Sequence, residues 1–413
     1  MVSITHLKKV SVITNGCPEN RIDCARIQEI FKRGGWKVTD DFCDADLIIF
    51  NACGLTNYNQ EYSIDIVNQI KERKKPSARL IACGCLPKIN KNRVQEVWQD
   101  IVSESDAIQW LDEILHKDIK SEEIHANYLI NSSNFINRND KSFLSFKNIE
   151  RLMMTFIELP MRICRTRLSK VINVYNPHTF CIKVSTGCSN KCAYCAVQLS
   201  RGHVKSKPIK NIKKEFKEGL KKNYKEFALI GTDVGSYGRD IGTDLVSLLK
   251  ELIKNKGEYT IKLRNVHPRF LIEMMPELQE VFQSGKISYI CSAAQSGNNR
   301  VLKLMDRGYK IEDFKEAIRT INKKFPNIKI RTQLMTGFPG ETKADFKDTV
   351  RLLNELRFDF VEVYNFESRP GTKAEKLEGK VPQKVACRRY HRLCITSFFH
   401  MCDSKKYKRK VLS

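Results

Sequence analysis

The 413-residue sequence predicts an α/β protein with two parts: an N-terminal open parallel α/β sheet domain, and behind it a partial (β/α)6 barrel. The first observation is that short apolar runs, typical of buried parallel strands, alternate with stretches of helical spacing. The second is that this alternation starts again at about residue 178 and continues through six strand–helix units. The third is that cysteines follow predicted strands, at the sheet edge where ligands gather.

The N-terminal sheet domain is expected at residues 1–120. Its three predicted strands are VSVIT (10–14), ADLIIF (45–50) and ARLIA (78–82). The stretches between them, residues 21–35 and 59–75, carry apolar residues at helical spacing. They end at Gly34-Gly35 and before Pro76, which are helix stop signals.

A cysteine stands just after each of these strands, and the three are Cys17, Cys53 and Cys85. Because the carboxyl ends of parallel strands meet at one edge, these cysteines can converge although they are far apart in sequence. A glycine beside each cysteine permits tight backbone around a bulky group, at Gly16, Gly54 and Gly84. Cys83 is an alternative to Cys85, and three buried core cysteines are the alternative to a shared site.

Residues 121–172 are expected to be a linker, and residues 173–400 the partial barrel. The six predicted barrel strands are TFCIKVS (179–185), EFALIGT (226–232), YTIKLRN (259–265), ISYICSA (287–293), IKIRTQLM (328–335) and FVEVYNF (360–366). Helices are predicted between them, for example at residues 209–223 and 342–356. A closing helix is expected at residues 384–402.

The most specific motif follows the first barrel strand, in the run VSTGCSNKCAYCAV. Its cysteines have the spacing C-x3-C-x2-C and are Cys188, Cys192 and Cys195. Three thiolates can hold three irons of a [4Fe–4S] cluster and leave the fourth iron open for a ligand. A zinc site with His203 as the fourth ligand is the alternative.

The charge of the chain favours an anionic partner. Lys and Arg number 72 against 47 Asp and Glu, which gives a net charge of +25. Such a balance is typical of RNA-binding proteins, and a lysine-rich solvated surface is the other interpretation. The basic tail, residues 401–413 with the run KKYKRK, is a candidate for phosphate contacts.

A cytoplasmic, reduced protein is expected. The fifteen cysteines occur in a chain far longer than disulfide-stabilised secreted domains. The start MVSITHLKKVSVIT has no secretory signal pattern, and no apolar run is long enough to cross a bilayer, so no membrane association is expected.

The motifs together closely resemble those of the radical-SAM methylthiotransferases. The similar segments are NGCPENRIDCARI, ADLIIFNACG, CGCLPK, GCSNKCAYC, LSRGHVKSKPIKNI, AAQSGNNRVLKLMDRGY, TGFPGETKADF and RPGTKAEKL. Members add a methylthio group to an unactivated carbon of a tRNA base or a ribosomal protein side chain. The stretch LIGTDVGSYGRDIGTDLVSLLKELI resembles the branch that acts on N6-threonylcarbamoyladenosine beside the tRNA anticodon, whereas GCPEN is more similar to the ribosomal-protein branch.

The resemblance implies two [4Fe–4S] clusters and S-adenosyl-L-methionine. Cys188, Cys192 and Cys195 would bind the cluster that cleaves this cofactor, and Cys17, Cys53 and Cys85 an auxiliary cluster. One cofactor molecule would methylate a sulfur at the auxiliary cluster, and a second would yield a radical that takes hydrogen from the substrate. An external electron donor is required, and no catalytic side chain is assigned.

The resemblance also suggests which residues contact the cofactor. They are Tyr194, Gly231, Thr232, Asp233, Gln295, Ser296, Gly337, Phe338 and Pro339. Simple packing, or turn and loop structure, is the alternative for each. Glu341 could instead cap the next helix beside Thr342.

Four further polar residues have open roles. Arg201 and Arg307 pair with a carboxylate or a phosphate, or else lie in surface pairs. His203 and His267 are interpreted as ordinary polar residues.

The chain departs from the family pattern in two respects. Family members usually carry a small C-terminal RNA-binding β-barrel, and the sequence after RPGTKAEKLEGKVP is too short for it. Three dipeptides also differ from the usual residues, at Thr332-Gln333, Ala293-Ala294 and Val197-Gln198. A tRNA substrate is favoured by the charge, and a protein or peptide substrate by the missing barrel.

Overall fold

The computed structural model describes residues 8–100, 111, 114–115, 124–131 and 178–411, with side chains up to Met401. The expected linker at residues 121–172 therefore lies largely outside the described residues. The chain divides into two compact units. Unit 1 comprises Met1–Ser133, Phe180–Leu252 and Glu367–Lys376, and unit 2 comprises Asn134–Thr179, Ile253–Phe366 and Leu377–Ser413.

The first sheet of unit 1 has four parallel strands in the order β2-β1-β3-β4. The strands are β1 (Lys9–Thr14), β2 (Lys37–Val38), β3 (Leu47–Ala52) and β4 (Arg79–Gly84). All six residues of β3 are buried, as expected of a central parallel strand covered on both faces. The three predicted N-terminal strands are thus confirmed, and the two-residue β2 is an addition.

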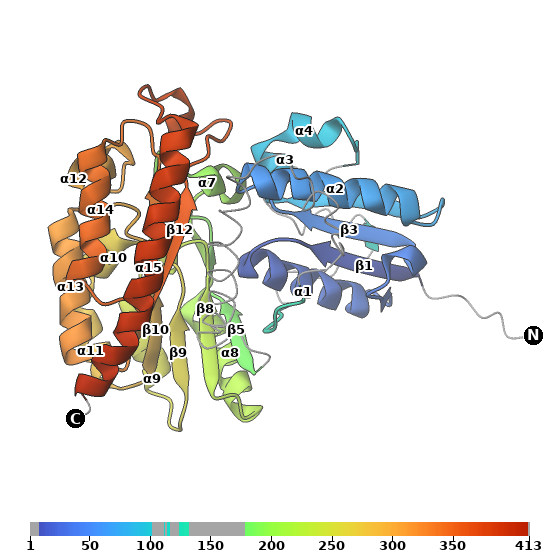
Figure 1. Cartoon of the computed structure of the whole chain (residues 1–413). Helices are drawn as coiled ribbons and strands as arrows, with labels where there is room; N and C mark the ends of the chain where they lie inside the picture. Colours follow the sequence, from blue (N-terminus) through green and yellow to red (C-terminus); the bar gives the residue numbers. More distant parts are fainter. Residues whose placement is uncertain (1–7, 101–110, 112–113, 116–123, 132–177, 412–413) are drawn as a thin grey trace, which may run out of the picture. The chain divides into compact units, whose positions relative to one another are not determined.

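Helices cover both faces of this sheet, and Figure 1 shows α1 and α2 on opposite sides of it. The helical segments are α1 (Pro18–Arg33), η1 (Phe42–Asp44), α2 (Asn57–Arg73), α3 (Cys85–Ile89) and α4 (Lys91–Gln95). Residue Cys17 is the N-cap of α1, and Pro18 occupies the first turn, where its missing N–H costs nothing. Below the sheet, Ile27 and Phe31 of α1 pack with Val10 and Ile49 in one hydrophobic core.

The second sheet has six parallel strands in the order β12-β11-β10-β9-β8-β5, so that each strand lies beside its neighbour in sequence. The strands are β5 (Thr179–Lys183), β8 (Glu226–Ile230), β9 (Thr260–Leu263), β10 (Ile287–Cys291), β11 (Lys329–Thr336) and β12 (Phe360–Asn365). A short antiparallel pair, β6 (Ser185–Thr186) with β7 (Lys205–Ser206), frames the loop that follows β5. The six predicted strands of the partial barrel are confirmed.

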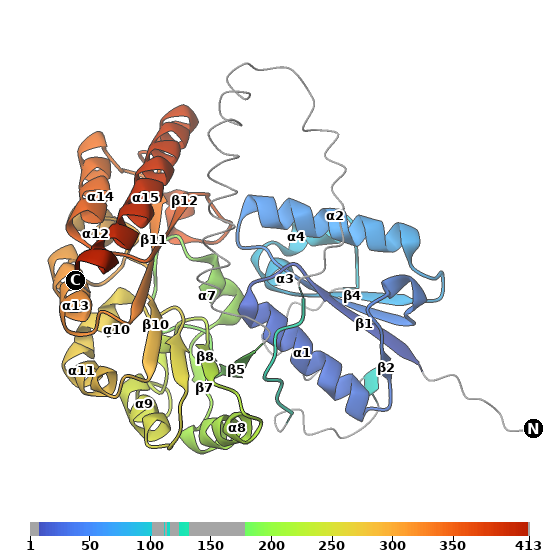
Figure 2. The ribbon, with the colours of Figure 1, turned by 60° about the horizontal axis from the view of Figure 1, so that its bottom comes forward.

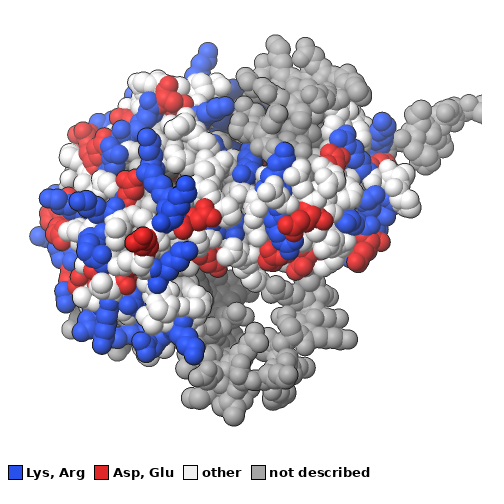
Figure 3. Space-filling model, turned by 90° about the horizontal axis from the view of Figure 1, so that it is seen from above, with Lys and Arg blue, Asp and Glu red and all other residues white. Residues whose placement is uncertain are grey.

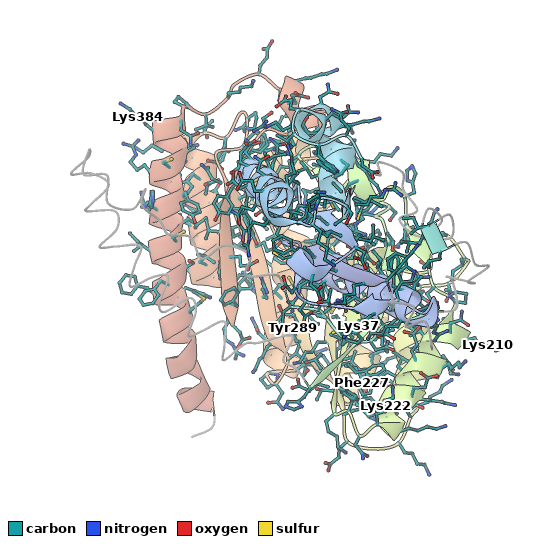
Figure 4. All side chains as sticks on the ribbon, turned by 90° about the vertical axis from the view of Figure 1, so that its right-hand side faces the viewer. Lys37, Lys210, Lys222, Phe227, Tyr289 and Lys384 are labelled. Carbon is teal, nitrogen blue, oxygen red and sulfur yellow. The ribbon has the colours of Figure 1, made fainter. Side chains whose placement is uncertain are left out.

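The helix α8 (Ile209–Lys221) shows how amphipathic spacing fixes the outer layer. Its buried Phe216 lies 4.1 Å, between ring centroids, from Phe227 of β8. Lys210 and Lys222, near the two ends of the helix, are exposed and project away from Phe227 (Figure 4). The apolar face therefore holds the helix on the sheet and leaves a row of lysines in solvent.

Helices of unit 2 line the outer side of their strands (Figure 2). They are α10 (Pro268–Glu273), α11 (Met275–Gln283), α12 (Asn299–Leu304), α13 (Ile311–Lys324), α14 (Lys343–Glu355) and α15 (Gln383–Val411), and α9 (Leu245–Ile253) precedes them. The helix α15 packs against β12 and α14, and its backbone continues through the predicted basic tail. A capping box of Thr342 and Asp345 starts α14, so the alternative that Glu341 caps this helix is wrong.

Charges of both signs cover the surface. Figure 3 shows Lys and Arg spread over one face with Asp and Glu among them. Within the described part of the chain, no helix has the length and apolar character that a membrane span requires.

Candidate metal and cofactor sites

The three strand-end cysteines meet at the carboxyl edge of the first sheet. Strands β1, β3 and β4 are neighbours, with Thr14 beside Asn51 and Ala52 beside Gly84. Cys53 and Cys85 directly follow β3 and β4, and Cys17 comes three residues after β1. The three cysteines therefore follow neighbouring strands at the same edge of this sheet.

The amide of Asn20 links two of these cysteines. Its Oδ1 lies 3.8 Å from the Sγ of Cys17 and 3.8 Å from the Sγ of Cys85. Its Nδ2 donates to Asn51 Oδ1 at 2.8 Å, which fixes the amide in one orientation. Asn20 lies within the motif NGCPENRIDC, but sequence analysis did not single it out.

A separate polar network holds Cys53. Its backbone N–H donates to Asn15 Oδ1 at 3.0 Å, and its carbonyl accepts from Ser63 Oγ at 2.8 Å. Asn15 Nδ2 donates to the same Ser63 hydroxyl at 2.9 Å. Burial, with the charge of Cys85 adding to it, raises the pKa of the Cys53 thiol to about 12. A bound metal would displace that proton.

Cys83 and Cys85 face different surroundings. Cys83 is 0% exposed and belongs to the hydrophobic core below the sheet, with Val10 and Ile81. Burial raises the pKa of its thiol to about 12. Cys85 is half-buried and borders Asn20. This geometry supports Cys85 as the third ligand.

The C-x3-C-x2-C loop is held by hydrogen bonds to Cys188. Its backbone N–H donates to Gly202 O at 3.2 Å, and the Asn190 amide donates to its Sγ at 3.3 Å. The Sγ lies 3.6 Å from Asp233 Oδ2, which also accepts from Asn190 Nδ2 at 2.8 Å. Burial and the Asp233 charge raise the pKa of the Cys188 thiol to about 12. The Asn190 side-chain amide thus donates a hydrogen bond to the Cys188 sulfur, as is common at iron–sulfur sites.

The predicted residues after β8 border this loop. Thr232 Oγ1 accepts from Gly187 N at 3.0 Å and donates to the Glu19 carboxylate at 3.0 Å. Asp233 is buried and accepts from Gly235 N at 3.0 Å. Gly231 has no space for a side chain, because a Cβ there would lie 2.7 Å from Ser185 Oγ. These three residues thus support the cysteine loop from the neighbouring strand.

The short helix α7 (Ala196–Arg201) leads from one set of cysteines to the other. Its N-cap is Cys195, and it packs against α3, which begins at Cys85. Its last residue, Arg201, donates to Asp23 Oδ2 at 2.7 Å and to Asn20 Oδ1. Arg201 is therefore the partner of a carboxylate, in a pair whose side chains are 12% and 17% exposed, and not part of a surface pair.

In unit 2, Gln295 has the features of a ligand-binding residue. It is 7% exposed, has φ +67° and forms backbone bonds to Gln333 O and Met335 N at 2.8 Å. Its Oε1 has no hydrogen-bond partner within the described residues. A buried amide oxygen of this kind, on backbone in a sparsely populated region, fits a polar ligand such as S-adenosyl-L-methionine.

The remaining predicted contacts of unit 2 are more structural. Ser296 Oγ lies 3.3 Å from Thr349 Oγ1 and accepts from Asn298 N. Phe338 is buried with its ring centroid 5.2 Å from that of Phe366, and Pro339 is buried beside it. Gly337 has φ +76° and donates its N–H to Glu341 Oε1.

Glu341 was assigned no contact, yet it is the buried acid of this turn. Arg389 donates to its Oε1 at 2.6 Å, and its Oε2 has no hydrogen-bond partner in the part of the chain that is described. Burial raises the pKa of this carboxyl.

The other residues with open roles are now placed. Tyr194 is partly exposed between Ala193 and Cys195, and His203 is exposed. His267 is the N-cap of α10 and accepts from Arg269 N, as expected of a structural histidine. Arg307 is buried and donates to Ala293 O, so its surface alternative is wrong. Among the described residues, no three His, Cys, Asp or Glu side chains are grouped to hold a single metal ion.

Comparison with known proteins assigns the class. The Radical SAM superfamily matches residues 182–353, and the Uncharacterized protein family UPF0004 matches residues 9–103. Among solved structures, the radical S-adenosylmethionine methyltransferase TsrM from Kitasatospora setae has a TM-score of 0.59 at 12% identity, covering 89% of this chain and 77% of that one. This structural likeness concerns the fold.

Curated relatives identify the family. A threonylcarbamoyladenosine tRNA methylthiotransferase of Thermotoga maritima is 30% identical over 91% of this chain and 79% of its own length. A ribosomal protein uS12 methylthiotransferase of Treponema denticola is 31% identical over 90% and 78%. A tRNA-2-methylthio-N(6)-dimethylallyladenosine synthase of Fusobacterium nucleatum is 28% identical over 98% and 87%. The chain belongs to the radical-SAM methylthiotransferases, and its class implies a [4Fe–4S] cluster and S-adenosyl-L-methionine.

Proposed function

We propose that this enzyme transfers a methylthio group to C2 of N6-threonylcarbamoyladenosine next to the anticodon of tRNA. The relatives from Thermotoga maritima and Mus musculus, 30% and 29% identical, are named threonylcarbamoyladenosine tRNA methylthiotransferases. The net charge of +25 supports a polyanionic substrate.

Two [4Fe–4S] clusters are part of the proposal. Cys188, Cys192 and Cys195 hold the first, and Cys17, Cys53 and Cys85 hold the second. The observation that carries this is the meeting of three cysteines from three neighbouring strand ends, in the same unit as the C-x3-C-x2-C loop. When bound, S-adenosyl-L-methionine and the clusters supply the radical and the sulfur, and an external donor supplies the electrons.

The chain's own residues bind and orient these groups. The Asn190 amide and the Asp233 carboxylate fix Cys188, and Thr232 fixes the backbone of Gly187. Tyr194, Gln295, Gly337, Phe338 and Pro339 are proposed cofactor contacts. Since the reacting C–H bond is unactivated, no acid or base side chain is assigned a step; the protein supplies position and excludes water.

A ribosomal protein is the second candidate substrate. The Treponema denticola relative is as similar to this chain as the tRNA enzymes are. A methylthiolated protein or peptide side chain is the product in that case.

The test compares substrates with one enzyme preparation. Anaerobically reconstituted enzyme is given S-adenosyl-L-methionine, a reductant and sulfide, with tRNA that carries or lacks the threonylcarbamoyl group, or with uS12. Nucleoside and peptide mass spectrometry detect the product. Methylthiolation of the threonylcarbamoylated tRNA alone supports the proposal, and modification of uS12 alone moves the assignment to the protein branch.

The matched control replaces Cys17, Cys53 and Cys85 with Ala. This variant should still form 5′-deoxyadenosine but should release no methylthiolated product. Unimpaired product formation would show that the strand-end cysteines have no part in the reaction.

A further inference from the structure

Two guanidinium groups with little exposed surface, those of Arg201 and Arg369, bind residues that lie beside or follow the strand-end cysteines. They come from distant segments: Arg201 ends α7, and Arg369 lies in the RPGTKAEKL motif, within the loop that unit 1 includes as Glu367–Lys376. Neither residue has a part in the function proposed above, and this inference rests on that function.

Arg201 reaches two of the cysteines through one shared oxygen. Its Nη2 donates to Asn20 Oδ1, and this oxygen lies 3.8 Å from the Sγ atoms of both Cys17 and Cys85. Burial lowers the pKa of Arg201, but the charges of Glu19, Cys85, Asp23 and Cys17 outweigh it and hold the pKa well above the usual value. The group is a permanent cation beside the site, and these two bonds use two of its five N–H donors.

Arg369 is the more deeply buried of the two, with 2% of its surface exposed. It donates to Asn57 Oδ1 and, at 2.9 Å, to Gln60 Oε1, both on α2. Its Nε has no hydrogen-bond partner among the described residues. The side chains that bind this cation are thus neutral amides, and its buried Nε–H is left for another acceptor.

The helix that binds Arg369 follows one of these cysteines in the chain. Helix α2, which holds it, begins four residues after Cys53. Burial lowers the pKa of Arg369, while the charges of Glu367, Cys53 and Glu61 act in the opposite direction. The loop is fixed on both sides, because Asn57 N donates to Glu367 Oε2 at 2.6 Å and Ala374 N donates to Ala193 O at 2.8 Å.

We propose that Arg201 and Arg369 bind the sulfur that is to be transferred, as a hydrosulfide or methylthiolate anion held beside Cys17, Cys53 and Cys85. Three thiolates already place negative charge at this site, so a further anion needs nearby cations. Guanidinium groups supply both charge and directed N–H donors. The unpartnered Nε of a nearly fully buried arginine is the donor such an anion would satisfy.

The test measures anion binding rather than turnover. The full chain with Cys188, Cys192 and Cys195 replaced by Ala is reconstituted anaerobically, and about four irons per chain are expected. Sodium hydrosulfide and sodium methanethiolate are titrated in separate arms, and absorption and electron paramagnetic resonance spectra follow the remaining cluster. In this background, R201Q and R369Q should each weaken anion binding roughly tenfold or more at unchanged iron content.

Two control variants remove a cation that binds a side chain of α1 or α2 but makes no hydrogen bond to Asn20, Asn57 or Gln60. K183Q removes the other cation that binds Asp23, and R93Q removes a cation that binds Glu61 on α2. Both should bind the anions within about twofold of the parent, because exposed or partly exposed pairs contribute little. R201K and R369K keep the charge but lose the planar fork, so their affinities should lie between those of the parent and the Gln variants.

The outcomes separate this inference from the proposed function. Anion binding by R201Q and R369Q as tight as by the two controls overturns it, and so does a four-iron parent that binds neither anion. If a Gln variant loses its iron, the Lys variant at full iron decides: weaker binding than the parent supports the inference, and equal binding overturns it. A parent without iron overturns the two-cluster proposal itself, and the inference with it.

Discussion

Cys83 and Cys85 are separated by one residue, yet the strand turns their side chains into different environments. Cys83 lies in β4 and points into the apolar core, whereas Cys85 comes after the strand end and borders Asn20. Successive strand residues alternate between faces, but the chain turns at Gly84, whose φ of +93° favours glycine. The change of direction at Gly84 is what brings Cys85 to the sheet edge.

The first prediction separates the two thiols. Cys85→Ala should lower the iron content from about eight to about four per chain, because one cluster loses a ligand. Cys83→Ala should keep all the iron and lower the free energy of unfolding by about 1 kcal/mol, since it removes one buried sulfur from the core. Iron analysis and urea unfolding measure the two effects. Loss of iron in Cys83→Ala but not in Cys85→Ala would show that Cys83, and not Cys85, is the cluster ligand.

The second prediction concerns a largely buried ion pair of unit 2, with side chains 21% and 14% exposed. Glu362 on β12 accepts from Arg331, and also from Gln333 Nε2 and Tyr364 Oη at 2.9 and 2.8 Å. Burial raises the pKa of Glu362, but Arg331 and these hydrogen bonds outweigh it and lower the pKa to about 2.

A carboxyl whose pKa is lowered in the folded state stabilises the fold above its unfolded pKa, near 4.5, and loses this effect as the pH falls toward 2. We expect Glu362→Gln to lower the free energy of unfolding at pH 7 by roughly 3 kcal/mol, because Arg331 is left without its partner. The difference from the parent should shrink between pH 4.5 and pH 2. Urea unfolding of the iron-free chain across this range checks it, and a pH-independent difference would contradict the assigned titration.

At the level of elements, the loop between β5 and α7 passes close to the backbone of His203. Gly187 has φ +79°, and a Cβ there would overlap the carbonyl oxygen of His203. Gly202, the C-cap of α7, has φ +69° but open space around the position of a Cβ. The two glycines therefore form a matched pair that differs in crowding.

The third prediction uses this pair. Gly187→Ala should displace the loop, so that the chain holds about four irons instead of eight and forms no 5′-deoxyadenosine. Gly202→Ala should cost only the backbone strain, about 1–2 kcal/mol, and keep both properties. Iron analysis and chromatography of the cleavage product measure the outcome. Equal behaviour of the two variants would mean that the approach to His203 is not what shapes the loop.

The sequence predicted the elements that are set by local pattern. The strands came from apolar runs such as residues 45–50, and the convergence of the cysteines came from the rule that parallel strand ends share an edge. The bonds of Arg201 to Asn20 and of Arg369 to Gln60 join residues 181 and 309 positions apart, so no local pattern contains them. Short elements such as α3 and α4 are stabilised by packing rather than by propensity, which is why spacing did not show them.

The whole molecule carries a large positive charge, spread over its surface with acidic residues interspersed (Figure 3). The exposed lysines of α8 and the basic residues of 401–413 are the candidate contacts for a polyanion.

The fourth prediction follows from this charge. The affinity for tRNA should fall on the order of a hundredfold between 50 and 200 mM salt, because each phosphate contact releases counterions. Deleting residues 405–413 should weaken binding while leaving cofactor cleavage unchanged. Filter binding across a salt series measures it, and salt-independent binding or no binding would favour a protein substrate instead.

Unit 1 is built from segments that are distant in sequence, which restricts how this chain can recombine with related chains. Glu19 and Asp23 of α1 form ion pairs with Lys183 and Arg201, which come after residues 134–179 in the sequence. A recombination event that replaced only the N-terminal sheet domain would leave these partly buried cations without their carboxylate partners and so destabilise the fold. A stable recombinant would have to inherit both segments of unit 1 from the same parent. Positions 19, 23, 183 and 201 should therefore covary among homologous sequences.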